Sequence, residues 1–120
     1  SFAIRLGNGG GYATRMFMNS VGVTTFSNTV TATNFILSSD KRLKNNIKEV
    51  SSNHIDVNWK NFELKSEPGV KRAGVIAQEL EEVHPEFVRT DDKGMKSVAY
   101  IDLLIAKIAE LEARLDKAGI

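Results

Sequence analysis

The chain has 120 residues, with 16 basic and 15 acidic side chains, a formal net charge of +1 and no cysteine. A nearly neutral charge, without a Lys/Arg cluster interleaved with aromatic residues, argues against a nucleic-acid partner. The lack of cysteine excludes disulfides and thiolate metal sites, and no apolar run approaches the roughly 18 residues of a membrane span. We therefore expect no nucleic acid, membrane, metal or cofactor. Because residue 1 is Ser rather than Met, we also expect a piece of a longer chain.

Charge divides the chain near residue 38. Residues 1–38 carry two charged side chains, Arg5 and Arg15, and no acid, whereas the rest carries 14 basic and all 15 acidic side chains. Because the two parts differ so strongly, we do not expect one compact core. The sequence predicts an α+β protein with a short N-terminal β segment at 1–38. A small mixed α+β core and a C-terminal helix follow in residues 39–120.

Glycines mark an early turn, since Gly7 and residues 9–11 surround Asn8. Neither a GK[ST] sequence nor a helix-forming run follows. We therefore expect a turn between strands rather than a phosphate-binding loop. A small nucleotide- or glycan-binding domain that uses this loop stays an alternative. Residues 12–18 are β-prone, and residues 26–33 alternate with the period of a half-buried strand.

A sheet made of a few short strands is marginally stable in water without partners. We therefore expect residues 1–38 to borrow their core from other copies of the chain. An intertwined β-structure made by three chains would meet that need, although the periodicity does not give the number three.

The downstream part begins at Asp40, a candidate N-cap for a short helical turn through Ile47. Alternating apolar residues at Ile55, Val57 and Trp59 predict a strand, and Phe62 continues it after a break. Short turns and elements then follow. They are a turn at residues 67–69, a helix with apolar residues at Ile76, Leu80 and Val83 that Pro85 ends, and a hairpin turn at 91–94 before a strand near 95–100. Gly74 predicts a close approach of another group to the backbone.

Residues 101–118 carry the strongest helical periodicity. Ile101, Ile108 and Leu115 share one heptad position, and Leu104, Leu111 and Ala118 share another, while Ile105 widens the stripe. One interpretation is a terminal helix docked on its own core. Self-association is favoured, because the β segment also needs partner chains.

A hydroxyl and an amine lie close together in sequence at the junction, as Ser39 and Lys44. A serine becomes a nucleophile when a base takes its proton, and a lysine amine is such a base once burial or a nearby cation has lowered its pKa. Arg42 is a nearby cation. The histidines, His54 and His84, lie far from this pair in sequence. We expect them to be surface or hydrogen-bonded core residues rather than metal ligands.

Three motifs follow one another from the junction onward. Residues 39–47 read SDKRLKNNI, residues 74–79 read GVIAQE with Pro85 and Val88 behind them, and Val98, Tyr100 and Leu103 precede the heptads. Together they resemble the SDxRxKxxI and GxIAQE…P…V patterns of the self-cleaving intramolecular chaperone domains found at the C-termini of phage tailspikes, tail fibres and neck appendages. The resemblance covers residues 39–120. Residues 1–38 carry no such motif and would be the end of the fibre or spike.

By position, the resemblance implies that Ser39 is the nucleophile, that Lys44 is the general base and that the Ser38–Ser39 bond is cut. Asp40 either orients Ser39 or caps the helix, with the cap slightly favoured. Glu79 either assists the site or lies on a solvated helix face. The attack runs either through an ester with the preceding carbonyl or with assistance from a neighbouring chain.

The resemblance also implies an autocatalytic serine peptidase that acts once. It would form a homotrimer through a coiled coil at about residues 101–118, fold the upstream segment 1–38 and then release itself. The protein would be a virion tail component before cleavage, assembled in the host cytoplasm, with the chaperone part absent from the mature fibre. The alternative is a purely structural trimerisation module of a fibre or adhesin, in which Ser39 and Lys44 are inert.

Overall fold

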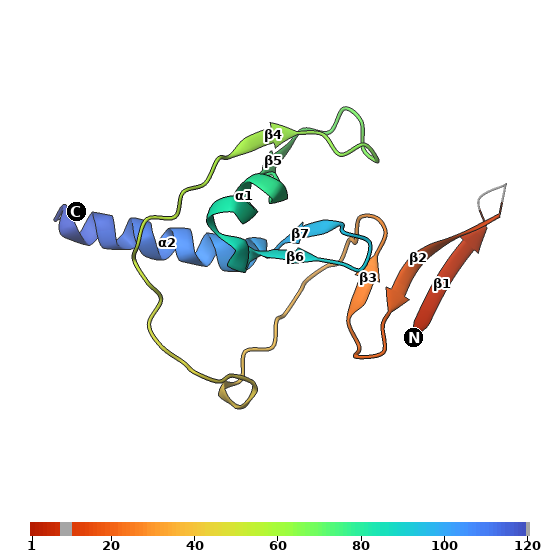
Figure 1. The fold of residues 1–120 in the computed structure, drawn as a ribbon, viewed down its shortest axis with the longest axis horizontal. Helices are drawn as coiled ribbons and strands as arrows, with labels where there is room; N and C mark the ends of the chain where they lie inside the picture. Colours follow the sequence, from red (N-terminus) through yellow and green to blue (C-terminus); the bar gives the residue numbers. More distant parts are fainter. Residues whose placement is uncertain (8–10, 120) are drawn as a thin grey trace. The chain divides into compact units, whose positions relative to one another are not determined.

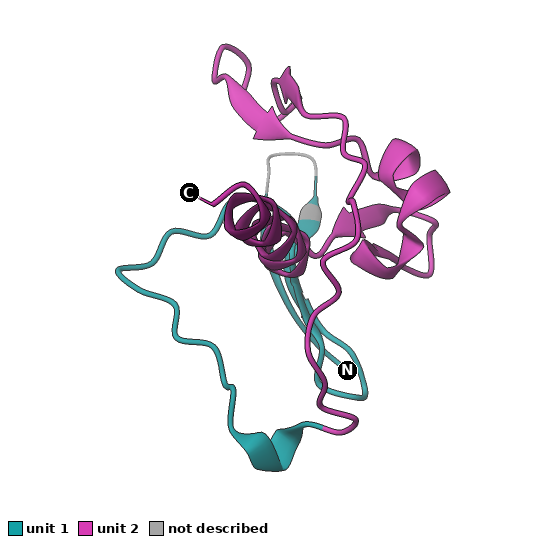
Figure 2. Ribbon diagram, turned by 90° about the vertical axis from the view of Figure 1, so that its left-hand side faces the viewer, with its two compact units in different colours: residues 1–44 teal, residues 45–120 magenta. Residues whose placement is uncertain are grey.

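The computed structural model describes residues 1–7 and 11–119 and has the mixed α+β composition that the sequence predicts (Figure 1). The chain divides into two compact units, Ser1–Lys44 (unit 1) and Asn45–Ile120 (unit 2), coloured separately in Figure 2. The predicted domain boundary between residues 38 and 39 coincides with the expected cut and stays a prediction. In the described part of the chain, no helix is long and apolar enough to cross a membrane.

Unit 1 is built on a three-stranded antiparallel sheet in the order β1-β2-β3. The strands are β1 at Phe2–Gly7, β2 at Tyr12–Met18 and β3 at Thr24–Phe26. β1 and β2 pair along their whole length as a hairpin, with one irregularity in register. The glycine-rich turn that we predicted between them includes residues 8–10, which lie outside the described residues. The prediction of β-structure at residues 12–18 is confirmed by β2.

The strand predicted at residues 26–33 is wrong beyond its first residue. β3 ends at Phe26, and residues 27–33 are exposed and form no strand. The backbone N–H of Ser27 still bonds the carbonyl of Arg15 at 3.0 Å, but Asn28 then turns its side-chain oxygen onto the next N–H. Alternating side chains define a face, whereas a strand also needs a neighbour for its backbone groups. Among residues 1–7 and 11–119, the single chain provides no such neighbour.

Unit 2 gathers its short elements around one small apolar core. The elements are the hairpin β4 (Lys60–Phe62) with β5 (Arg72–Gly74), α1 (Ala77–Val83), the 3-10 helix η2 (Pro85–Phe87), the hairpin β6 (Val88–Thr90) with β7 (Lys96–Val98), and α2 (Tyr100–Lys117). The buried apolar residues are Val75, Leu80, Phe87, Val88 and Leu103. The predicted helix before Pro85, the hairpin around residues 91–94 and the terminal helix are therefore confirmed.

The predicted strand at residues 55–59 is wrong, because the nearest strand, β4, begins at Lys60. Ile55 and Val57 do pack against the core, so the apolar positions were identified correctly. Residues 54–57, which we call the strap, pair with no strand that the structure describes. Side chains of α2, and that of His84 between α1 and η2, form hydrogen bonds with the backbone groups of the strap instead.

Helix α2 has two apolar faces with different surroundings. Its inner face carries Leu103, which is fully buried in the core, and Glu110, which is buried as well. The outer stripe remains exposed to solvent in the single chain; it consists of Ile101, Leu104, Ile105, Ile108, Leu111 and Leu115. Docking of α2 on its own core is thus confirmed for the inner face, and self-association through the outer stripe stays a prediction.

Candidate active site

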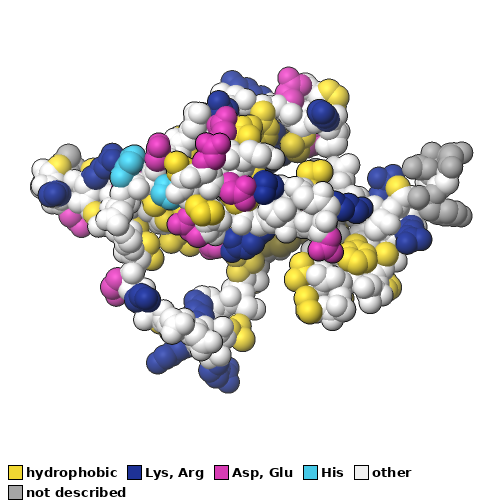
Figure 3. Space-filling view, viewed as in Figure 1, with side chains coloured by type: hydrophobic (Ala, Val, Ile, Leu, Met, Phe, Trp, Pro, Cys, Tyr) yellow, Lys and Arg dark blue, Asp and Glu magenta, His cyan; other side chains and the backbone are white. Residues whose placement is uncertain are grey.

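The junction forms a single short turn. The 3-10 helix η1 spans Lys41–Leu43, and Asp40 caps it by accepting a hydrogen bond from the N–H of Arg42 at 2.8 Å. The predicted turn through Ile47 is therefore too long. It ends because Lys44 has an extended backbone, with φ −120° and ψ 144°, and cannot continue a helix. Figure 3 shows the Lys and Arg side chains that surround this turn.

The turn brings the two candidate catalytic side chains together. The Nζ atom of Lys44 donates a hydrogen bond to Oγ of Ser39 at 2.6 Å, although five residues separate them in sequence. This spacing is within the range that proton transfer between a nucleophile and its base requires. Both residues are exposed in the single chain, as is Ser38 on the other side of the expected cut.

The carboxylate of Asp40 is directed to Arg42. Asp40 Oδ1 and Oδ2 accept hydrogen bonds from Nε and Nη2 of Arg42 at 3.1 and 3.0 Å. The side-chain bond from Arg42, followed by its backbone bond, lowers the pKa of Asp40, and the same pairing raises the pKa of Arg42. The positive charge of Arg42 is thus paired with a carboxylate within its own turn.

Glu79 belongs to unit 2 and lies in the first turn of α1. Its carboxylate accepts a long hydrogen bond from Asn58 Nδ2 at 3.4 Å and is 3.8 Å from Nζ of Lys60. Its neighbours within unit 2 are therefore an amide and an amine. A role for Glu79 beside Ser39 stays a prediction.

Gly74 makes the close approach that its position predicts. A Cβ atom there would meet the hydroxyl of Tyr100, the first residue of α2. That hydroxyl lies 3.0 Å from the backbone N of Val75 and accepts its hydrogen bond. The glycine of one family motif and the tyrosine of another therefore form a single contact.

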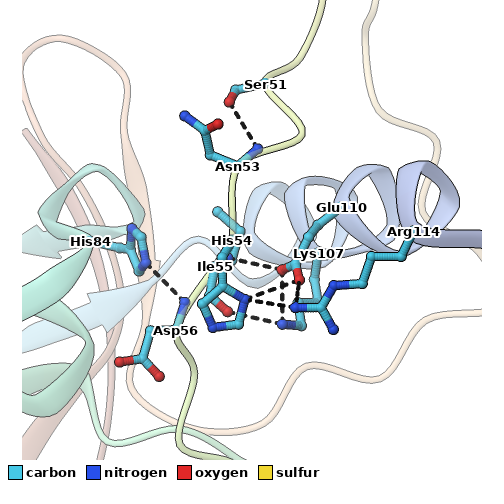
Figure 4. A network of polar contacts seen from close by, with 9 residues as sticks. All are labelled: Ser51, Asn53, His54, Ile55, Asp56, His84, Lys107, Glu110 and Arg114. Atoms are coloured by element: carbon cyan, nitrogen blue, oxygen red, sulfur yellow. Dashed lines mark hydrogen bonds and ion pairs between the residues drawn. The ribbon is translucent and has the colours of Figure 1, made fainter. Parts of the chain in front are cut away.

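Sequence reasoning missed a second polar cluster, drawn in Figure 4, in which the buried Glu110 binds the strap. His54 and His84 both contribute to it, as hydrogen-bonding residues of the kind the sequence predicts. The available signal was a charged residue at the spacing of the inner helix face, seven residues after Leu103. Among the described residues, no group of three His, Asp or Glu side chains could hold a metal ion.

Comparison with known proteins finds a similarity that begins at the junction. Residues 39–89 match a peptidase family described as chaperone of endosialidase. A probable tail fiber protein of Escherichia phage Phieco32 is 34% identical over 115 aligned positions. The alignment covers 76% of this chain, and the chain spans only 16% of that relative. No solved structure matches the chain. The matched segment begins at Ser39 and includes η1, the strap, β4, β5 and α1, so residues 39–89 are similar to the chaperone of endosialidase family, in agreement with the first two of the three motifs.

Proposed function

We propose that this chain is an intramolecular chaperone which assembles a phage tail fibre or spike as a homotrimer and then cuts itself off between Ser38 and Ser39. The observation that carries the proposal is the hydrogen bond of 2.6 Å between Lys44 and Ser39, at the first residues of the family match. The similarity to a tail fiber protein supports a fibre segment upstream of the cut.

The chemistry needs no cofactor. Lys44, once neutral, takes the proton of the Ser39 hydroxyl, and Oγ attacks the carbonyl carbon of Ser38. The Ser38–Ser39 amide bond breaks as an ester forms between the same two residues, and the proton passes to the departing nitrogen. Water then hydrolyses the ester, which leaves a carboxylate on Ser38 and restores the hydroxyl of Ser39. Attack by the hydroxyl of a neighbouring chain would give the same products.

Burial is the proposed trigger. An ammonium group cannot accept a proton, and a lysine loses its charge most readily where water is excluded. Ser39 and Lys44 already meet within one chain but are exposed there. Assembly with two further copies would desolvate the pair, so that cleavage reports a completed trimer. A monomer that cleaves as fast as the trimer would contradict this trigger.

Assembly is supported by both units. The outer stripe of α2 is an exposed apolar surface at heptad spacing, which suits a coiled coil. In unit 1, residues 27–33 have strand-like alternation but pair with no strand in the part of the chain that the structure describes. Trimerisation through α2 would raise the effective concentration of these segments for one another. Intertwined β-structure otherwise forms slowly, because its contacts are non-local.

Cleavage would then make the fibre kinetically stable. Once the chaperone has left, its unfolding can no longer reopen the β-structure that it helped to build. The uncut protein would be a virion tail component assembled in the host cytoplasm. The mature fibre would keep residues 1–38 and lose residues 39–120.

Denaturing mass spectrometry tests the function directly. Wild type should give two fragments that meet at Ser38/Ser39, whereas Ser39→Ala and Lys44→Ala should remain intact. Lys41→Ala is the matched control, because Lys41 lies in the same exposed turn. An intact wild type that nevertheless forms trimers would establish the non-cleaving structural module instead.

A further inference from the structure

Glu110 is a buried carboxylate bound by several donors at once (Figure 4). Its side chain is 2% exposed; Oε1 accepts a hydrogen bond from Lys107 Nζ at 2.9 Å, and Oε2 forms an ion pair with Arg114 Nη2 at 2.7 Å. Nδ1 of His54 lies 3.0 Å from Oε2. A buried charge is tolerated only with such complete pairing, and removal of its partners is costly.

The cluster recognises the backbone of the strap. The N–H of Ile55 donates to Oε1 of Glu110 at 2.9 Å, and the carbonyl of Ile55 accepts from Lys107 Nζ at 2.9 Å. The next N–H, that of Asp56, donates to Nε2 of His84 at 3.2 Å. These contacts replace the ladder that the strap would have as a strand. The strap is thus bound to α2 through backbone atoms that a β-partner would otherwise bind.

The charge of Glu110 is favoured by these contacts. The N–H of Ile55 contributes most, then His54 and Lys107, and the positive charge of Arg114 adds to them; together they lower the pKa of Glu110 to about 2. The titratable and charged groups that face it are Lys107 and Arg114 from α2 and His54 from the strap. The carboxylate therefore remains ionised throughout the neutral range.

We propose that Glu110 is a positioning residue, whose charged carboxylate fastens the strap to the inner face of α2 so that the segment following the cleavage motif is tied to the assembly helix. The inference rests on the proposed function where it concerns cleavage. Only residues 45–53 join Lys44 to the strap. The same helix therefore presents the outer stripe to other copies and, on its opposite face, anchors the chain that leads back to Ser39 and Lys44.

Hydrogen exchange on the 120-residue chain tests the fastening itself. In Glu110→Gln, the amide of Ile55 should exchange at least about tenfold faster than in wild type, because a charge-assisted hydrogen bond is lost. The amide of Leu103, within α2, should be much less affected. Glu112→Gln is the matched control, an exposed carboxylate on the same helix. Equal acceleration at Leu103, or unchanged protection of Ile55, would overturn the proposal.

The pH dependence of stability distinguishes a role of the Glu110 charge from a role of its packing alone. Because the folded pKa of Glu110 is lowered, its contribution to stability is fully present above the unfolded value of about 4.5 and is lost as the pH falls towards about 2. The urea midpoint of wild type should therefore fall more steeply between pH 5 and 2 than that of Glu110→Gln. Parallel slopes would count against a role of the charge. If Glu110→Gln does not fold, Arg114→Gln removes only one exposed partner and should give the same pattern more weakly.

The cleavage assay tests the consequence. Glu110→Gln should still form the assembly of wild type, measured by native mass spectrometry, but cleave at least about tenfold more slowly. Glu112→Gln should cleave normally. A loosened strap with normal cleavage would overturn the positioning role. A wild type that never cleaves would refute the proposed function and, with it, the catalytic consequence, while the exchange of Ile55 would still decide whether the strap is fastened.

Discussion

Units 1 and 2 both contain many apolar side chains, but only unit 2 buries them in a single chain. Leu103 of unit 2 is 0% exposed, whereas Ile36 of unit 1 is 89% exposed, and no described residue of unit 1 is buried. Unit 2 has a long helix whose inner face brings distant segments together. Unit 1 has one small sheet and an exposed extended tail. The difference indicates that hydrophobicity alone does not make a core; the chain must also supply a second layer.

The largest difference is expected between substitutions on the two faces of α2. Leu103→Ala should destabilise unit 2 by roughly 2–5 kcal/mol, because it leaves a cavity in a core of only five buried apolar residues. Leu104→Ala, one residue further on the exposed side, should change single-chain stability by less than about 0.5 kcal/mol. Chemical unfolding at low protein concentration measures both effects.

In self-association, the order of the two effects should be reversed. Leu104→Ala should weaken self-association, as measured by analytical ultracentrifugation, whereas unit 2 should remain folded. If Leu104→Ala unfolds the single chain as readily as Leu103→Ala does, the division of α2 into an inner face and an outer stripe is wrong.

A smaller effect is expected where Gly74 meets Tyr100. Gly74→Ala should destabilise unit 2 by about 1–3 kcal/mol, because the new methyl group would meet the hydroxyl of Tyr100. Tyr100→Phe alone should cost about 1 kcal/mol, since it removes the acceptor of the Val75 N–H. In the double variant the methyl group should cost less than in wild type, and a thermal-unfolding double-mutant cycle measures the coupling. Strictly additive effects would show that the two side chains do not clash.

The smallest effect is expected in unit 1. Oδ1 of Asn19 accepts hydrogen bonds from the N–H groups of Val21 and Val23 at 3.1 and 2.9 Å, which holds the turn between β2 and β3. Asn19→Ala should loosen this turn by about 0.5–1 kcal/mol, seen as faster hydrogen exchange at Val23. The melting of unit 2 should not change. A common loss of stability in both units would show that they unfold together.

Local signals in the sequence predicted local structure well. Periodicity identified α1 and α2, turn residues identified the hairpin β6–β7, and Asp40 was a sound N-cap. These elements are determined mainly by residues that lie close together in the sequence. Ser39 and Lys44 are close in sequence, and the turn at η1 brings them into contact.

Failures occurred where distant residues decide the outcome. Residues 27–33 and the strap both alternate like strands, but a strand also requires a partner that sequence alternation does not reveal. The acceptor of the Ile55 N–H lies 55 positions away, at Glu110. No residue near position 55 indicates that a carboxylate so distant in the sequence would accept this hydrogen bond. The local structure around η1 was therefore predictable, whereas the binding of the strap to α2 was not.

The backbone contacts of the strap determine which of its positions can vary in sequence. Glu110, Lys107 and His84 bind main-chain atoms, which every residue type except proline presents alike. Asp56 is exposed, so its side chain is free to vary as long as its N–H persists. The side chains of His54, Ile55 and Val57 do make contacts of their own, whereas residue 56 contributes only its backbone. Related chains could therefore vary residue 56 and still follow the same path, provided that neither residue 55 nor residue 56 becomes proline.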